Sequence, residues 1–132
     1  MSCLLAGAAA LVLGSPLFEL HWTHSVERTE WRELWRVGEG GLRLEAARVR
    51  GSGAGMEPGE GARLDDGWWV WHPDLAVPAL ALAASGATGG GWTLCADGAC
   101  RTLGAAEGEP VILRPCGTAW RAQKDSNPRP AD

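Results

Sequence analysis

Hydrophobic and polar side chains alternate along two neighbouring segments of the chain. In residues 17–26 the apolar positions after Leu17 are even-numbered, and His24 falls among them. In residues 31–37 the apolar positions are mostly odd-numbered, and Glu33 falls among them. A period of two predicts half-buried β-strands. The polar residues 27–30 between the two segments predict the loop of a β-hairpin.

This loop implies a register between the two strands. The predicted pairs across the hairpin are Val26–Trp31, His24–Glu33, Trp22–Trp35 and Leu20–Val37. All of them lie on the apolar face, and a slip of one residue would turn the apolar set toward solvent. An imidazole and a carboxylate would then meet between tryptophan rings.

The rest of the chain consists of short segments separated by turn signals. Residues 42–50 predict a strand with a bulge, because the parity of the apolar positions changes between Ala46 and Ala47. Residues 92–103 predict a hairpin around Asp97-Gly98, a sequence typical of type I′ turns. Further strands are predicted at 68–71, 80–84 and 111–114, where 80–84 can also be one helical turn.

These elements indicate an all-β fold. Frequent turns and the lack of a helical period favour a small antiparallel barrel or sandwich of about 7–9 short strands. One domain of this kind is expected over residues 16–116. Residues 117–132 are polar and contain prolines, and they are predicted to be a disordered tail.

The first fourteen residues carry no charge. They are too few for a comfortable transmembrane helix. They fit the apolar region of a signal peptide, which predicts a leader within residues 1–15 and export of the protein, although no basic residues precede it. A buried first strand or a short membrane anchor is the alternative.

Charge excludes one class of partner. The chain of 132 residues has a net charge of -4, with 8 tryptophans, 19 glycines and no tyrosine. Acidic and basic residues are interspersed, without the basic block that binds a phosphate backbone, so we expect no nucleic-acid partner.

Two of the four cysteines fall on facing positions. The turn at Asp97-Gly98 places Cys95 opposite Cys100, within disulfide range. This bridge predicts an oxidising compartment such as the periplasm, and a cytoplasmic location stays open. If Cys3 leaves with a leader, three cysteines remain, and any of three single bridges or a fully reduced protein is an alternative. The spacing of Cys95 and Cys100 also occurs in zinc sites, but no second compact pair follows, so we expect no metal.

His24 and Glu33 are the first candidates for chemistry. A carboxylate opposite an imidazole can hold one tautomer and raise its basicity. The pair is then a structural bridge, part of a ligand site, or an acid–base pair in which Glu33 or Glu27 assists His24. Ser25 points to the other face of the strand, which disfavours a serine nucleophile.

Two glycine-rich loops, 51–56 and 85–91, can offer backbone N–H groups to an anion. Neither contains a phosphate-loop or nucleophile-elbow motif, and we expect no cofactor. The predicted ligand-binding residues are His24, Glu33, Ser52, Gly53, Met56, Ser85, Gly86 and Thr88.

Five strings carry a resemblance to a known family. They are Trp-Thr-His-Ser-Val-Glu at 22–27, Gly-Ser-Gly-Ala-Gly-Met at 51–56, Asp-Gly-Trp-Trp-Val at 66–70, Ser-Gly-Ala-Thr-Gly-Gly at 85–90 and Leu-Arg-Pro-Cys at 113–116. Over about residues 18–116 the chain resembles DUF1850, a family of small bacterial proteins of unknown function. Its members are often encoded beside TRAP-type transporters of the TAXI subtype. The resemblance implies an exported accessory to solute uptake and assigns no activity and no functional residue.

We therefore expect a non-enzymatic, exported accessory protein. It would contact the membrane subunit or the solute-binding protein of a TRAP transporter, or bind a small solute itself. The alternatives are a small acid–base enzyme, which needs His24 in an open pocket, and a carbohydrate-binding module, which needs exposed tryptophan rings in a coplanar row.

Overall fold

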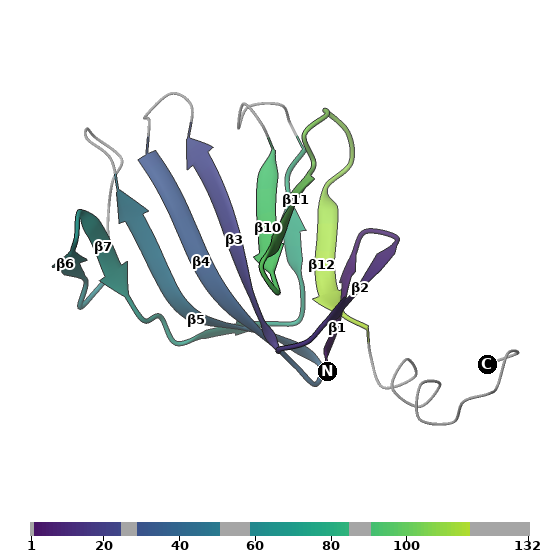
Figure 1. Ribbon diagram of the computed structural model, residues 1–132, viewed down its shortest axis with the longest axis horizontal. Helices are drawn as coiled ribbons and strands as arrows, with labels where there is room; N and C mark the ends of the chain where they lie inside the picture. Colours follow the sequence, from purple (N-terminus) through teal and green to yellow (C-terminus); the bar gives the residue numbers. More distant parts are fainter. Residues whose placement is uncertain (1, 25–28, 51–58, 85–90, 117–132) are drawn as a thin grey trace, which may run out of the picture.

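Twelve β-strands in two sheets make up the described part of the molecule (Figure 1). The structure is a computed structural model that describes residues 2–24, 29–50, 59–84 and 91–116. No helix long and apolar enough to cross a membrane occurs in these ranges.

The larger sheet has the strand order β11-β10-β3-β4-β5-β7-β6, and β8 also pairs with β5. Its strands are β3 (Leu17–His24), β4 (Thr29–Gly38), β5 (Gly41–Arg50), β6 (Arg63–Asp65), β7 (Trp68–Trp71), β8 (Leu75–Val77), β10 (Trp92–Ala96) and β11 (Ala99–Leu103). All pairs are antiparallel. The long strands β3, β4 and β5 form its centre, because alternation persists longest in those segments.

The smaller sheet has the order β2-β1-β12-β9. Its strands are β1 (Ser2–Ala6), β2 (Ala9–Leu13), β9 (Leu80–Leu82) and β12 (Val111–Pro115). In Figure 1 it lies toward one end of the larger sheet, whereas β7 and β6 lie at the other end.

The core lies between the two sheets. The larger sheet contributes Phe18, Leu20, Trp35, Leu42, Leu44 and Leu94, and the smaller sheet contributes Leu4, Ala6, Leu11, Leu13, Leu82 and Leu113. The fold is thus the predicted all-β class, in its sandwich form and not a closed barrel. It has more strands than expected, partly because the apolar N-terminal segment supplies two of them.

That N-terminal segment has the alternative structure named above, a buried strand. Leu4 is fully buried in β1, and Leu11 and Leu13 of β2 are also in the core. β1 pairs with both β2 and β12. A disulfide joins Cys3 to Cys116, with Cα atoms 5.4 Å apart. Cys116 therefore has a partner in this fold.

The register of the first hairpin differs from the prediction. β3 ends at His24, which pairs with Thr29, so that Trp22 lies opposite Trp31 and Phe18 opposite Trp35. The predicted pairs are displaced by two residues on each strand. A displacement of this size keeps every apolar side chain on its face, and alternation alone therefore cannot distinguish the two registers. The observed register places two of the most buried side chains, Phe18 and Trp35, directly opposite each other.

Local signals in the other segments are confirmed. Asp97 and Gly98 both have positive φ, as do Asp66 and Gly67 between β6 and β7, which is the conformation that a type I′ turn requires. The bulge predicted in β5 is present, because the β4–β5 register shifts beside Glu45. The strand at 68–71 lies inside the larger sheet, between β5 and β6.

Candidate functional site

Four tryptophans form a continuous row on the inner face of the larger sheet, the face that bears the core. Trp22 and Trp31 are stacked, with ring centroids 6.0 Å apart and an interplanar angle of 4°. Trp92 tilts against Trp22 with centroids 4.8 Å apart, and Trp71 meets Trp31 edge to face at 6.2 Å. We call Trp92, Trp22, Trp31 and Trp71 the indole row.

The indole row extends beyond the core. Trp22 and Trp92 pack against the core cluster, whereas Trp31 and Trp71 are not part of it or of its packing neighbours. All four side chains are only partly buried. Each ring contact adds about 0.5–1.5 kcal/mol beyond burial. The row is therefore both a structural element and a partly exposed aromatic surface on β10, β3, β4 and β7.

Hydrogen bonds hold two of these rings in place. Trp31 Nε1 donates to Thr29 Oγ1 at 3.3 Å, and Trp92 Nε1 donates to the backbone oxygen of Ala83 at 3.0 Å. Thr29 is only 1% exposed and is the one buried polar residue among the described residues. The sequence prediction missed its role, because it placed Thr29 inside the hairpin loop.

Glu33 lies on the same face, between Trp31 and Trp35 along β4. Its neighbours across the sheet are Leu20 on β3 and Ala47 on β5. Burial in these apolar surroundings raises the pKa of Glu33, and the hydrogen bond that Trp35 Nε1 donates to its Oε1 at 2.9 Å lowers it in part. The site thus combines indole rings with a carboxyl group that holds its proton more readily than an ordinary glutamate.

His24 does not meet Glu33. Its backbone pairs with Thr29, and Glu33 lies four residues further along β4, about 13 Å away at the rise of a strand. The predicted pair of imidazole and carboxylate is therefore wrong, for the reason given above for the register. The His24 side chain lies outside the described part of the structure.

The other predicted ligand-binding residues also lie outside the described residues. They are Ser52, Gly53, Met56, Ser85, Gly86 and Thr88. Their binding role stays a prediction. Glu33 is the predicted site residue whose side chain the structure does describe. The sequence prediction did not find the full indole row, because alternation does not tell which distant strands become neighbours.

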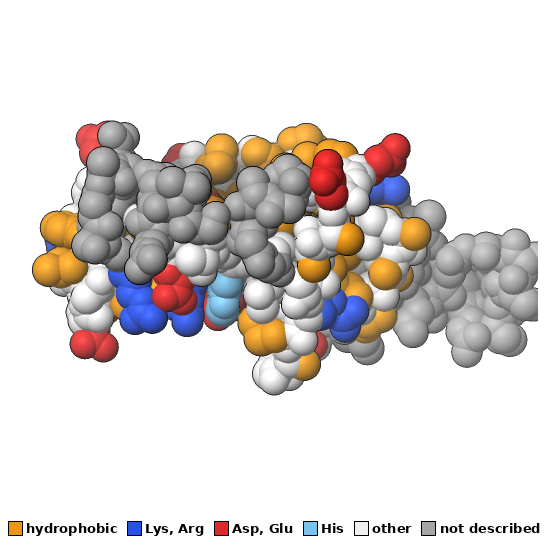
Figure 2. Space-filling view, turned by 90° about the horizontal axis from the view of Figure 1, so that it is seen from above, with side chains coloured by type: hydrophobic (Ala, Val, Ile, Leu, Met, Phe, Trp, Pro, Cys, Tyr) orange, Lys and Arg blue, Asp and Glu red, His pale blue; other side chains and the backbone are white. Residues whose placement is uncertain are grey.

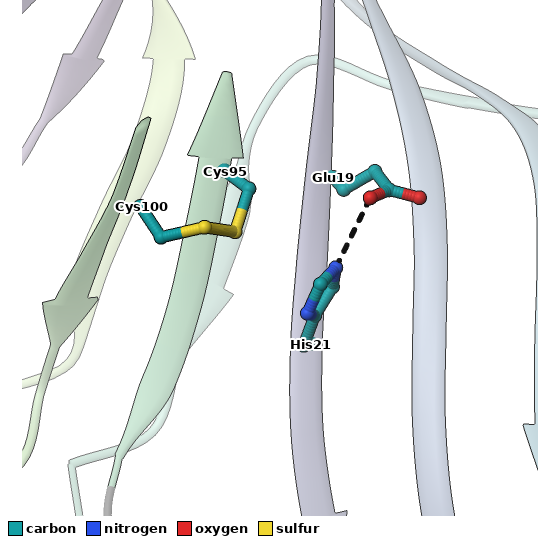
Figure 3. Close-up of a disulfide and its surroundings, with 4 residues drawn as sticks. All are labelled: Glu19, His21, Cys95 and Cys100. Carbon is teal, nitrogen blue, oxygen red and sulfur yellow. Dashed lines mark hydrogen bonds and ion pairs between the residues drawn. A yellow bond between two sulfur atoms is a disulfide. The ribbon is translucent and has the colours of Figure 1, made fainter. Parts of the chain in front are cut away.

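The predicted disulfide between Cys95 and Cys100 is confirmed. The two residues are directly opposite in the β10–β11 hairpin, with Cα atoms 4.0 Å apart. The bridge lies on the outer face of the larger sheet, where Glu19 and His21 of β3 are its neighbours (Figure 3). His21 Nε2 lies 3.2 Å from Glu19 Oε1. No described cysteine is free.

The two described grooves do not include Glu33, the described member of the predicted site. The described residues contain no group of three or more His, Cys, Asp and Glu side chains that could hold a metal ion. A groove of about 440 Å³ lies at the β4–β5 turn beside β8. Another of about 320 Å³ lies between β2 and the β10–β11 hairpin.

Fold and site together define a small β-sandwich with a tryptophan-lined inner face. The family model described as "Domain of unknown function (DUF1850)" matches residues 18–103, and the chain belongs to this family. The match runs from β3 to β11 and includes the indole row and Glu33. No curated protein and no solved structure matches the chain.

Proposed function

We propose that this protein is an exported, non-enzymatic accessory of a TRAP-type transporter of the TAXI subtype. It binds a transporter subunit, or a small solute, through the indole row. The observation that carries the proposal is the row itself: four contacting tryptophans, only partly buried, beside a carboxyl group with a raised pKa.

Aromatic surfaces of this kind suit recognition. Tryptophan is enriched among the residues that dominate binding energies, because it offers a large rigid surface and a single N–H donor. Glu33 adds a group that donates a hydrogen bond when protonated and accepts one when ionised. Export is supported by two disulfides, which persist in oxidising compartments.

The two alternative functions have less support. An acid–base enzyme built on His24 and Glu33 needs the two groups within hydrogen-bond reach of a shared substrate, and the observed register separates their backbones. A carbohydrate platform needs rings side by side in one plane. Here Trp22 and Trp31 face each other, and Trp92 and Trp71 are inclined at 51° and 82° to their neighbours.

The test is recovery of the neighbouring transporter subunits with the tagged protein from native membranes. We expect the wild type and Trp68→Phe, which alters a tryptophan on the opposite face of the sheet, to recover them equally. Trp31→Ala should recover several-fold less. Trp31→Phe keeps an aromatic ring at this position and is the variant to use if Trp31→Ala does not fold. Failure of the wild type to recover any subunit, or equal recovery by folded Trp31→Ala, would overturn the proposal.

A further inference from the structure

On the outer face of the larger sheet, basic side chains stand directly opposite one another. His21 pairs with Arg32 across β3 and β4, and Arg32 pairs with Arg48 across β4 and β5. Directly opposed residues lie on one face with Cβ atoms about 5 Å apart, and like charges at such positions are destabilising. Both guanidinium groups are cationic at every physiological pH. The strand pairing thus places two mutually repelling positive charges, those of Arg32 and Arg48, at the centre of the sheet.

Among the described residues, two glutamates are shared between the basic side chains of this cluster. Glu19 Oε2 lies 3.3 Å from Arg48 Nη2, and its other oxygen contacts His21. Glu30 is shared as well, with Arg32 Nη2 at 3.3 Å and Arg50 Nη2 at 2.9 Å. Arg32 Nε is buried and has no hydrogen-bond partner within the described residues. A buried donor without a partner carries a free-energy cost that an arriving acceptor can remove.

Trp68 holds the arginines in place. The guanidinium carbons of Arg32, Arg48 and Arg50 lie 5.0, 5.3 and 4.5 Å from the centroid of its ring. Cation–π attraction acts over this range. Donors that are positioned beforehand lose less conformational entropy when they bind. Figure 2 shows arginine side chains gathered with acidic side chains, beside a histidine, on one side of the molecule.

We propose that this cluster, which we call the arginine site, binds an oxyanion with several oxygens, either a polycarboxylate or a phosphate. Arg32 and Arg48 donate to the anion from neighbouring strands, since a guanidinium group matches carboxylate and phosphate geometry with two parallel N–H bonds. The anion relieves the repulsion between Arg32 and Arg48. The arginine site lies on the opposite face of the sheet from the indole row and does not depend on the function proposed for that row.

Arg43 provides a matched control. It lies on β5 like Arg48 and also forms one ion pair, with Asp74 Oδ1 at 2.6 Å. It pairs with Arg36 across the same two strands, so it too stands opposite an arginine. It does not share Trp68 with the arginine site. Arg43→Gln and Arg48→Gln therefore remove the same charge from the same strand.

The experiment titrates the full chain with citrate and, separately, with inorganic phosphate, at constant ionic strength with chloride as the balancing anion. Calorimetry gives the affinity, and the indole N–H resonance of Trp68, assigned with Trp68→Phe, reports the location. We expect saturable binding of at least one of the two anions with a shift of that resonance. Arg48→Gln should weaken binding at least tenfold, and Arg43→Gln less than twofold.

The two probes also identify the kind of anion. Saturation by citrate alone assigns the site to carboxylates, and saturation by phosphate alone assigns it to phosphates. Absence of saturable binding by either anion would overturn the proposal, as would equal weakening by the two variants. In that case the arginines form only an exposed ion-pair ladder. Loss of the arginine site leaves the recovery of transporter subunits by the indole row unchanged, so the two proposals can fail separately.

Discussion

The two faces of the larger sheet are built by the same strands but have opposite chemistry. On the inner face, β3 and β4 place Trp22, Trp31 and Glu33 among apolar neighbours. On the outer face, the alternate positions of β4 carry Glu30 and Arg32, which form an ion pair, and Glu30 also pairs with Arg50 of β5. Both faces carry glutamates. Burial raises the pKa of Glu33 on the inner face, whereas Glu30 on the outer face forms ion pairs with two arginines. The environment that each face provides, rather than the residue type, decides what a glutamate contributes.

This contrast also separates two sources of stability. Aromatic packing on the inner face removes apolar surface from water, at about 25 cal/mol per Å². Ion pairs on the outer face join partly exposed groups, and such pairs contribute about 0–1 kcal/mol each. Substitutions on the two faces should therefore differ in size, in salt dependence and in pH dependence.

The largest difference is expected between two tryptophan substitutions. Trp35 is 2% exposed in the core, so Trp35→Ala should reduce the free energy of unfolding by about 3–5 kcal/mol through the cavity it leaves. Trp68→Ala, on the outer face, should cost less than half as much. Urea denaturation of both variants measures the two losses. Equal losses would contradict the assignment of the core to the inner face.

A smaller loss is expected from the outer-face disulfide. Replacing both Cys95 and Cys100 by serine should reduce the free energy of unfolding by about 2 kcal/mol, because the closed loop is short. The Cys3–Cys116 bridge has a sequence separation of 113, and its removal should cost about twice as much in the same model. Thermal unfolding of the two double variants compares them, and the reverse order would contradict the entropic explanation.

A stabilising effect is expected on the inner face at Glu33. Between the ordinary pKa of a glutamate and its raised value, the native state binds more protons than the unfolded state, so stability falls as pH rises through this window. Glu33→Gln keeps an acceptor for Trp35 Nε1. It should stabilise the protein at neutral pH by on the order of 1 kcal/mol, the scale of one uncompensated buried polar group. It should also abolish the decrease in stability with rising pH. Denaturation from pH 4 to 8 is the measurement, with the exposed Glu107→Gln as a control. A loss of stability in Glu33→Gln at neutral pH would refute it.

The smallest effect is expected for an ion pair on the outer face. Arg36 and Glu45 are both partly exposed. Glu45→Gln should change the free energy of unfolding by less than about 1 kcal/mol, and the change should shrink in high salt. Denaturation at low and high sodium chloride concentrations measures it. A large, salt-independent loss would show that the two faces are less different than their composition indicates.

Local patterns in the sequence predicted local structure well. Asp97-Gly98 gave the correct turn and thereby the facing cysteines, and the change of parity at Ala46 and Ala47 gave the bulge beside Glu45. These features depend only on residues close in sequence. The faces of β3 and β4 were also correct, since alternation determines parity.

Features that depend on distant contacts were not predictable in this way. The choice between His24–Glu33 and His24–Thr29 depends on where the chain turns, and both registers keep the same faces. The burial of β1 depends on its pairing with β12 at the other end of the described chain. The raised pKa of Glu33 arises from burial beneath the neighbouring strands, and the hydrogen bond from Trp35 opposes it in part. No spacing rule in β4 reveals this burial.

The bond between Cys3 and Cys116 turns most of the polypeptide into a covalent ring. A backbone hydrogen bond joins the same two residues: the amide of Cys116 donates to the carbonyl oxygen of Cys3 at 3.1 Å. A protease that cuts once anywhere inside the ring would leave its two fragments attached, and they would separate on a gel only after reduction. Because β1 and the end of β12 are neighbours, a short linker between them would allow the chain to be opened at the Asp66-Gly67 turn with the same pairing of strands.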